Sequence, residues 1–352
     1  MPLDLSRDAA QLTADLVGIE SASGGEARLA AEIESALQAL PHLEVRSDGA
    51  TVIARTGLGR AQRVILAGHI DTVPVAGNLP ARASQGRLYG CGASDMKSGV
   101  AIQLRLAAAL ASPARDVTYV FYDCEEVEAE RNGLGRIARE QPGLLAGDFA
   151  VLLEPTGGVV EGGCQGTLRA EITATGERAH SARAWQGRNA IHEARGILDV
   201  LRGYQPRRPE VDGLTYREGL NAVAISGGVA GNVIPDRCVV TVNFRFAPDR
   251  SPGQAEDHVR EVFAGWPVTV ADLAPAARPG MDSPAAASFA AAVGGTPRAK
   301  LGWTDVARFA ELGVPAVNYG PGEPEVAHSR GEYVEIAKIG ECEDRMRAWL
   351  TG

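Results

Sequence analysis

The segment RVILAGHIDTVP, residues 63–74, joins a predicted strand to two ionisable side chains. Its apolar run, Val64 to Leu66, is typical of a strand that is buried on both faces of a sheet. His69 and Asp71 follow this run two residues apart. In an open α/β sheet, ligands bind just beyond the carboxyl ends of the strands. The imidazole and the carboxylate therefore indicate a functional site at the end of this strand.

The same alternation of elements extends along the first half of the chain. The apolar spacing predicts helices over 5–20, 26–40 and 97–112, and strands over 43–49, 51–56, 63–68, 117–123 and 149–154. Strands that alternate with helices imply a largely parallel sheet that is covered by helices.

A different pattern begins at Thr167. Strands over 167–175, 221–228 and 238–246, with helices over 187–203 and 252–264, predict a small α+β domain with a half-exposed sheet. The alternation of helices and strands seen in the first half then returns, with a helix over 304–313, a strand over 315–320 and a helix over 335–350. We therefore expect a catalytic domain of residues 1–166 and 278–352, interrupted by an inserted domain of residues 167–277. The Pro and Ala content of 272–287 favours a linker there.

Length and composition exclude several classes of protein. A chain of 352 residues is longer than one core usually supports, and 45% hydrophobic with 22% charged residues is ordinary for globular proteins. The net charge of −9 and the absence of a basic run argue against nucleic-acid binding. No apolar stretch is long enough to cross a membrane, and the sequence MPLDLSRDAA does not resemble a secretion signal. Five scattered cysteines without a CxxC pair predict reduced thiols, so we expect a cytoplasmic protein.

Carboxylates and a second histidine follow other predicted strands. Glu125 and Glu126 follow the strand over 117–123, Glu154 closes the next one, Asp95 lies in a glycine-rich loop before a helix, and His328 follows the strand over 315–320. Each has an ordinary alternative: Asp95 as a helix cap, the glutamates as a solvated pair, and the histidine as a loop residue. Together, two histidines and several carboxylates at strand ends favour a zinc site.

Five motifs in this order resemble the dinuclear-zinc aminoacylase and glutamate-carboxypeptidase superfamily. They are GHIDTVP at 68–74, GCGASDMKSG at 90–99, DCEE at 123–126, LLEPT at 152–156 and AHS at 327–329. The resemblance implies a zinc-peptidase-like catalytic domain with a mixed, mostly parallel sheet. It also implies that the inserted domain is ferredoxin-like and serves as a lid and as the contact of a homodimer. The implied cofactors are two Zn²⁺ ions per chain, for which Co²⁺ can substitute.

The resemblance also assigns roles to the metal ligands. It implies that His69 and Glu154 hold one zinc ion, that Glu126 and His328 hold the other, and that Asp95 bridges both. In this superfamily the peptide bond after the bridging aspartate, here Asp95–Met96, is commonly cis.

Three further residues receive catalytic roles from the resemblance. Asp71 would accept the second ring N–H of His69 and fix its tautomer. Glu125 would be the general base and acid. His180 would cross the dimer interface and stabilise the oxyanion. Substrate contacts are implied for Arg183, Asn232, Arg245, Gly302, Thr304 and Arg308, of which Arg183 replaces an aromatic residue of some relatives.

The expected activity is hydrolysis of an amide bond in a small anionic N-acyl amino acid. Other acyl-amino-acid hydrolases and dipeptidases share the metal motifs, so the substrate remains open at this point. A metal-stabilised binding protein without catalysis is the non-enzyme alternative. Glu125 argues against it, because a purely structural site has no use for an unliganded acid beside the metals.

Overall fold

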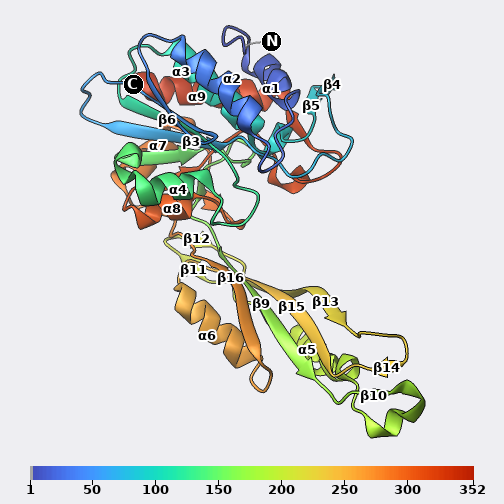
Figure 1. The fold of residues 1–352 in the computed structure, drawn as a ribbon. Coiled ribbons are helices and arrows are strands. Elements are labelled where there is room, and N and C mark those ends of the chain that lie inside the picture. Colours follow the sequence, from blue (N-terminus) through green and yellow to red (C-terminus); the bar gives the residue numbers. More distant parts are fainter. Residues whose placement is uncertain (1–2) are drawn as a thin grey trace. The chain divides into compact units, whose positions relative to one another are not determined.

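The structure, a computed structural model, describes residues 3–352. The chain forms two compact units (Figure 1). The first unit comprises Met1–Gly163, Pro279–Arg298 and Asp305–Gly352, and the second comprises Cys164–Arg278 and Ala299–Thr304. The second unit therefore takes in a short segment, Ala299–Thr304, that lies outside the inserted domain expected at 167–277.

An eight-stranded sheet forms the centre of the first unit. In order across the sheet the strands are β1 (Glu44–Asp48), β2 (Thr51–Arg55), β6 (Asp116–Tyr122), β3 (Arg63–His69), β7 (Phe149–Leu152), β18 (Ala316–Asn318), β8 (Glu161–Gly162) and β17 (Arg298–Ala299). The four strands β6, β3, β7 and β18 are parallel neighbours, whereas β1, β2 and β8 pair antiparallel with theirs. The expected mixed α/β sheet is confirmed.

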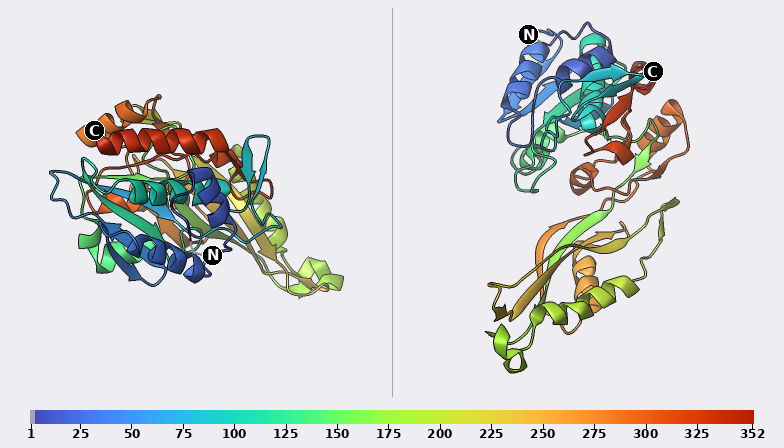
Figure 2. Two further views of the ribbon diagram at one scale, coloured as in Figure 1. Left: turned by 90° about the horizontal axis from the view of Figure 1, so that it is seen from above. Right: turned by 90° about the vertical axis from the view of Figure 1, so that its right-hand side faces the viewer.

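Helices cover both faces of this sheet, which explains its continuous apolar strands. All seven residues of β6 are buried. One face packs against α1 (Ala9–Val17), α2 (Ala27–Gln38), α3 (Ser98–Ala109), α7 (Pro284–Val293) and α9 (Ile336–Thr351). Figures 1 and 2 show α4 (Gly133–Glu140) and α8 (Val306–Glu311) on the other face.

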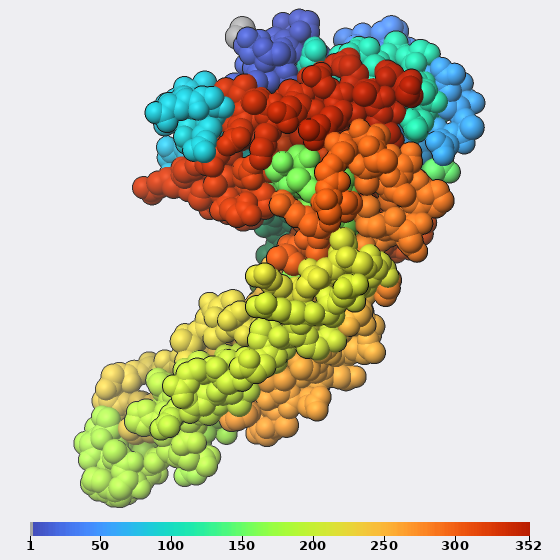
Figure 3. Space-filling model, turned by 180° about the vertical axis from the view of Figure 1, so that it is seen from behind, coloured from blue at the N-terminus to red at the C-terminus, as the bar shows by residue number. Residues whose placement is uncertain are grey.

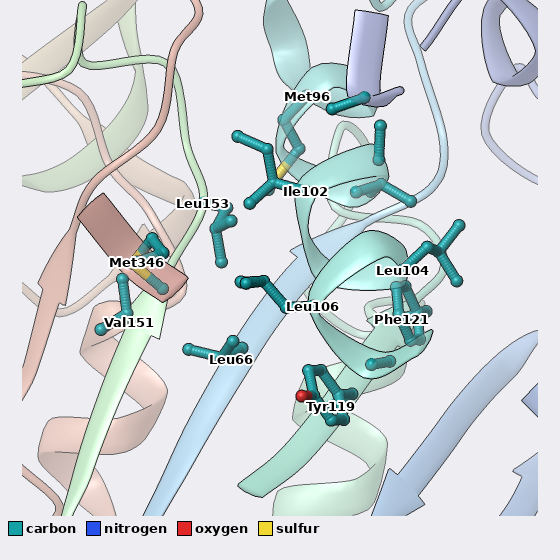
Figure 4. Packing of buried hydrophobic residues seen from close by; sticks show 14 of the residues in the cluster. Leu66, Met96, Ile102, Leu104, Leu106, Tyr119, Phe121, Val151, Leu153 and Met346 are labelled. Carbon is teal, nitrogen blue, oxygen red and sulfur yellow. The ribbon is translucent and has the colours of Figure 1, made fainter. Parts of the chain in front are cut away.

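The core of the first unit lies between α3 and the central strands. Figure 4 shows Leu106 of α3 beside Leu66 of β3, and Ile102 of α3 on the side of Leu153, and these four side chains are buried. α9 closes this side and lies along the surface of the unit (Figure 3). Its Trp349 packs edge-on against the ring of Phe289, 4.8 Å away between ring centroids.

A small sheet in the first unit was not predicted from the sequence. It consists of β19 (Tyr333–Glu335), β5 (Arg87–Tyr89) and β4 (Arg82–Ser84), all antiparallel. It joins the chain just before Asp95 to the chain just after His328. The two loops that carry these residues are therefore fixed to one another by backbone pairing.

The second unit is an antiparallel sheet with both of its long helices on one face. Its strands are β13 (Gly219–Gly227), β15 (Arg237–Phe246), β9 (Gly166–Thr175) and β16 (Val268–Ala274) in that order, and its helices are α5 (Ala190–Gly203) and α6 (Pro252–Val262). β9 alternates between buried and more exposed residues, as a sheet with one covered face requires. The predicted α+β architecture is confirmed.

Three short elements complete the second unit. β10 (Ala179–His180) pairs with β14 (Val233–Ile234), and the turn that follows it spans Ser181–Gln186. β11 (Glu210–Val211) pairs with β12 (Leu214–Thr215).

The linker predicted from composition is shorter than expected, although the chain does pass from the second unit to the first within it, between Arg278 and Pro279. The segment 272–287 begins inside β16 and ends inside α7, so only residues 275–283 lack regular structure. Val268 and Val270 of β16 pack against the core of the second unit, and Phe289 of α7 is fully buried in the first. Both β16 and α7 form because their apolar side chains pack into the two cores, and the Pro and Ala content does not indicate this packing.

The five cysteines are all buried free thiols, as predicted. Among the described residues, no helix has the length and apolar character that crossing a membrane requires.

Candidate metal centre

Three of the predicted ligands, His69, Glu126 and Glu154, lie at the carboxyl ends of three adjacent parallel strands. His69 is the last residue of β3, and not beyond the strand as the sequence suggested. Glu125 and Glu126 follow β6, and Glu154 follows β7. Since parallel strands end at the same edge of a sheet, residues far apart in sequence come together there.

Four of the five predicted metal ligands are in direct contact. His69 Nε2 lies 3.1 Å from Asp95 Oδ1, and His328 Nε2 lies 3.4 Å from Asp95 Oδ2. His328 Nε2 also lies 2.7 Å from Glu126 Oε1. Asp95 thus stands between the two imidazoles. Ligand atoms of His69, Asp95 and Glu126, one from each, lie within 4.8 Å of one another, which is close enough for the three residues to bind one metal ion.

Glu154, the fifth predicted ligand, is only 4% exposed. Its negative charge is one of those that raise the pKa of Glu125, so it belongs to the same cluster of charges.

The ring of His69 is oriented as a metal ligand requires. Its Nδ1 lies 3.1 Å from the backbone oxygen of Asp71, which can only accept a hydrogen bond. Nδ1 therefore donates, and the neutral ring keeps its lone pair on Nε2, the atom that faces Asp95. Metal-binding histidines commonly donate their other N–H to a carbonyl or carboxylate in this way.

The Asp71 side chain bonds chiefly to backbone amides, whereas the ring N–H of His69 expected to reach its carboxylate lies nearer to its backbone oxygen. Its Oδ1 lies 3.5 Å from His69 Nδ1 and accepts the backbone N–H of Glu125 at 3.0 Å. Its Oδ2 accepts the N–H of Glu126 at 3.1 Å and the hydroxyl of Ser23 at 2.7 Å. Asp71 therefore orients the segment that carries the proposed base as well as the imidazole.

The loop that carries Asp95 has an unusual backbone. Gly92 has a φ of 78°, a left-handed conformation that glycine adopts without strain, and a Cβ at this position would lie 2.6 Å from the Thr72 side chain. The peptide bond Asp95–Met96 is cis, as the superfamily resemblance implies. His328 also has a left-handed backbone, with a φ of 58°.

The charges of the cluster are not balanced by the protein alone. Burial raises the pKa of Glu125 well above its usual value, and the charges of Glu126, Glu154 and Asp305 add to this effect against the opposing His69. Burial likewise raises the pKa of Asp305, although Arg308 opposes it.

Both imidazoles respond to the surrounding carboxylates. Hydrogen bonds to Asp95 and Glu126 raise the pKa of His328 to about 11. The pKa of His69 is raised well above its usual value, because hydrogen bonds to Asp71 and Asp95 outweigh its burial. A cluster of crowded carboxylates and imidazoles is suited to bind divalent cations.

The remaining predicted residues fall in both units. Arg308 lies in the first unit, with Nε 3.3 Å from Asp305 Oδ1. His180, Arg183, Asn232, Arg245, Gly302 and Thr304 lie in the second unit. His180 is exposed, and its Nδ1 accepts the N–H of Ala182 at 3.0 Å. Its neutral ring therefore carries the proton on Nε2.

Sequence reasoning missed several residues that support the cluster. Glu332 accepts backbone N–H groups of the Asp95 loop, and Asn132 donates to Asp305 Oδ2 at 2.9 Å. Ser23 donates to Asp71. The position of Asp305, next to the expected substrate contact Thr304, is the one signal in the sequence that could have indicated it.

Known proteins resemble the whole chain. The model of peptidase family M20/M25/M40 matches residues 65–351. A desuccinylase of succinyl-diaminopimelate from Corynebacterium glutamicum is 47% identical, over 99% of this chain and 98% of its own. A Mycobacterium tuberculosis protein that carries the same name provisionally is 56% identical, over 99% of this chain and 100% of its own. A Staphylococcus aureus tripeptidase has the same fold, with a TM-score of 0.80 at 20% identity over 100% of this chain and 99% of that one.

Proposed function

The chain belongs to peptidase family M20/M25/M40, and from that premise we propose that it hydrolyses N-succinyl-LL-2,6-diaminopimelate to succinate and LL-2,6-diaminopimelate. This reaction is a step of lysine and diaminopimelate biosynthesis. The relatives of the same name support the assignment, because their identity of 47% and 56% extends over nearly the full length. The observation in the structure that carries the proposal is the cluster of His69, Asp95, Glu126 and His328.

We propose two Zn²⁺ ions as the cofactors, with Co²⁺ able to substitute. The donor set supports this choice, because imidazoles and carboxylates are zinc ligands and His69 presents Nε2 to Asp95. His69 and Glu154 would hold one ion, Glu126 and His328 the other, and Asp95 both. Two such ions polarise the scissile carbonyl and lower the pKa of the attacking water.

Glu125 is proposed to move the protons of the reaction. It directly precedes the proposed ligand Glu126, where a carboxylate can accept a proton from the attacking water and later return it to the leaving amine. Asp71 fixes its position, because the backbone N–H of Glu125 is bonded to Asp71 Oδ1. His180 would donate its Nε2 proton to the developing oxyanion, which fits the acceptor role of its Nδ1.

The substrate carries several carboxylates and needs cationic or amide anchors. We propose that Arg183, Asn232, Arg245, Gly302, Thr304 and Arg308 provide them. Arginine binds a carboxylate through two parallel hydrogen bonds and so fixes its orientation.

Two copies of the chain are proposed to associate through the second unit. Its edge strand β13 exposes Val223 (59%) and Ile225 (53%), and the adjacent α5 exposes Ile191 (44%) and Leu198 (42%). An apolar edge strand of this kind favours pairing with an identical strand in a twofold dimer. In that dimer, His180 is proposed to act in the active site of the partner chain. We also propose a cytoplasmic location, which suits the five buried free thiols.

The substrate assignment is tested by comparing kcat/KM of the zinc-loaded protein on N-succinyl-LL-2,6-diaminopimelate with that on N-acetylornithine and on dipeptides. The succinylated substrate should be preferred by at least tenfold, because only its acyl group carries a carboxylate for the anchors. A preference for N-acetylornithine would make the protein an acetylornithine deacetylase, and a preference for dipeptides would make it a dipeptidase. Metal binding without turnover of any of them would favour a binding protein.

A further inference from the structure

Glu332 is a buried carboxylate that makes three hydrogen bonds to the backbone of the Asp95 loop. It is 2% exposed. Its Oε2 accepts the N–H of Gly92 at 3.0 Å, and its Oε1 accepts the N–H groups of Ser94 at 2.9 Å and Asp95 at 3.0 Å. Backbone N–H groups in a buried loop need an acceptor, and one side chain supplies it here for three of them.

The same residue ties this loop to the segment that carries His328. The backbone oxygen of Glu332 accepts the N–H of Gly90, and its own N–H donates to Ser329, the residue after His328. The Ser94 hydroxyl donates to the backbone oxygen of Glu323 in the same segment at 2.9 Å.

The contact between the two segments is too close for a side chain. A Cβ at Gly322 would lie only 2.2 Å from the backbone oxygen of Ser94. Two of the predicted ligands, Asp95 and His328, are therefore carried by backbone segments that bond directly to one another.

The other side of the loop is also fixed. Lys97 is 1% exposed, and its Nζ donates to the backbone oxygens of Leu16 at 3.1 Å and Ile19 at 2.7 Å. These oxygens lie at and just beyond the carboxyl end of α1. Asp95 is therefore held between Glu332, which binds its own N–H, and Lys97, which anchors the chain two residues later.

We propose that Glu332 is a positioning residue that holds the Asp95 carboxylate between His69 and His328, and that it thereby sets the affinity of the site for divalent metal. Glu332 acts through the backbone N–H groups of the Asp95 loop. The inference rests on the proposed metal site. It goes beyond that site in assigning a role to a residue outside the ligand set.

The chemistry of the three bonds predicts the effect of a conservative change. A glutamine at this position has one oxygen, which can still accept from Ser94 and Asp95, and one NH₂ group, which cannot accept from Gly92. Residues that orient metal ligands typically change metal affinity by roughly 10- to 100-fold when they are replaced. We expect Glu332→Gln to weaken zinc binding by about tenfold, the lower end of that range, because two of the three bonds remain.

The experiment measures zinc affinity by competition with a chromophoric chelator, without reference to activity. Glu343→Gln is the matched control, because Glu343 is also buried at 8% exposure in the first unit and is bonded to Arg347. Both variants lose a buried carboxylate, and both should lower the melting temperature of the metal-free protein. Only Glu332→Gln should weaken zinc binding.

The outcomes separate this inference from the proposed function. If the wild-type chain binds no zinc, the proposed function itself is wrong. If the wild-type chain binds zinc and a folded Glu332→Gln binds it within twofold of wild type, the positioning role is wrong.

Hydrogen exchange provides a second measurement that needs no variant. The amides of Gly92, Ser94 and Asp95 should be protected in the metal-free wild-type protein, because their acceptor is Glu332 and not a metal ion. If these amides exchange at the rate of an unstructured peptide, the positioning role is also contradicted.

Discussion

Both units bury carboxylates, but they balance the charge differently. In the second unit, the Glu218 side chain is fully buried, and its Oε1 lies 2.6 Å from Arg207 Nη2 and 3.0 Å from Arg250 Nε. These arginines and the N–H of Ala247 lower the pKa of Glu218 despite its burial. In the first unit, burial and neighbouring carboxylates raise the pKa of Glu125 well above its usual value. The protein supplies enough positive charge for Glu218 but not for Glu125.

The exposed apolar surface shows the opposite distribution. The second unit leaves Val223, Ile225, Ile191 and Leu198 exposed on β13 and α5. Among the described residues of the first unit, one large apolar side chain is exposed, that of Leu58 at 38%. The carboxylate cluster of the first unit is the proposed place of the metal ions, and the exposed apolar face of the second unit is the proposed contact of the dimer.

The largest expected effect comes from Glu125→Gln. The zinc-loaded variant should lose about 10³-fold in kcat, because the proton carrier is removed while the metal ligands remain. Its metal-free form should melt roughly 2–4 °C higher than the metal-free wild type, because burying an ionisable carboxyl among other carboxylates costs free energy that glutamine avoids. Steady-state kinetics, elemental analysis and thermal melting measure the three quantities.

Glu128→Gln is the control for this prediction, because Glu128 lies on the same loop and its side chain is 66% exposed. It should change neither turnover nor melting. Loss of zinc from Glu125→Gln would instead identify Glu125 as a ligand, and a lower melting temperature of the metal-free variant would contradict the charge imbalance.

The proposed partner of the second unit can be tested by mixing inactive variants. Glu125→Ala and His180→Ala should each be nearly inactive as pure dimers. After joint unfolding and refolding in equal amounts, random pairing makes about half of the dimers mixed, and one of the two sites in each is whole. Activity should return to roughly a quarter of wild type. If mixed dimers are detected by mass spectrometry and no activity returns, His180 does not act in the partner chain.

A smaller effect is expected when Glu218, the carboxylate paired with Arg207 and Arg250, is removed. Glu218→Ala should lower the free energy of unfolding by about 3 kcal/mol at neutral pH, because it removes a buried carboxylate and leaves the partly buried Arg250 without its partner. The control Glu256→Ala breaks the exposed pair with Arg260 and should cost about 0.5 kcal/mol or less. Denaturant titration measures both.

The effect of Glu218 should depend on pH. Because its folded pKa lies below the ordinary value of 4.5, its stabilisation is full above that pH and is lost as the pH falls through the folded pKa. The difference between wild type and Glu218→Ala should therefore shrink as the medium is acidified below about pH 4.5. An equal difference at neutral and acidic pH would show that the charge of Glu218 does not stabilise the fold.

Much of the first unit could be predicted because its signals are local. The apolar runs of β3, β6 and β7 are continuous in the sequence, and polar residues follow each of them directly. The carboxyl ends of parallel strands meet at one edge, so a sheet predicted from apolar runs also predicts the cluster of His69, Glu125, Glu126 and Glu154.

What the sequence did not reveal depends on contacts between distant segments. Glu332 bonds to Gly92, 240 residues earlier in the chain, and Asn132 bonds to Asp305, 173 residues later. The short strands β5 and β19 pair across a similar separation and carry no periodic pattern of their own. Asp71 was predicted from its spacing to His69, but its bonds to the backbone of Glu125 and Glu126 exist only in the folded chain.

Two divalent metal ions are proposed to balance the carboxylates of the first unit and make it active. Titration of the chelator-treated protein with Zn²⁺ tests this proposal, with turnover of N-succinyl-LL-2,6-diaminopimelate and bound metal per chain both recorded. Turnover should be absent at the start, rise with added metal and stop rising at two bound ions per chain. Full turnover in protein shown by elemental analysis to contain no metal would contradict the claim.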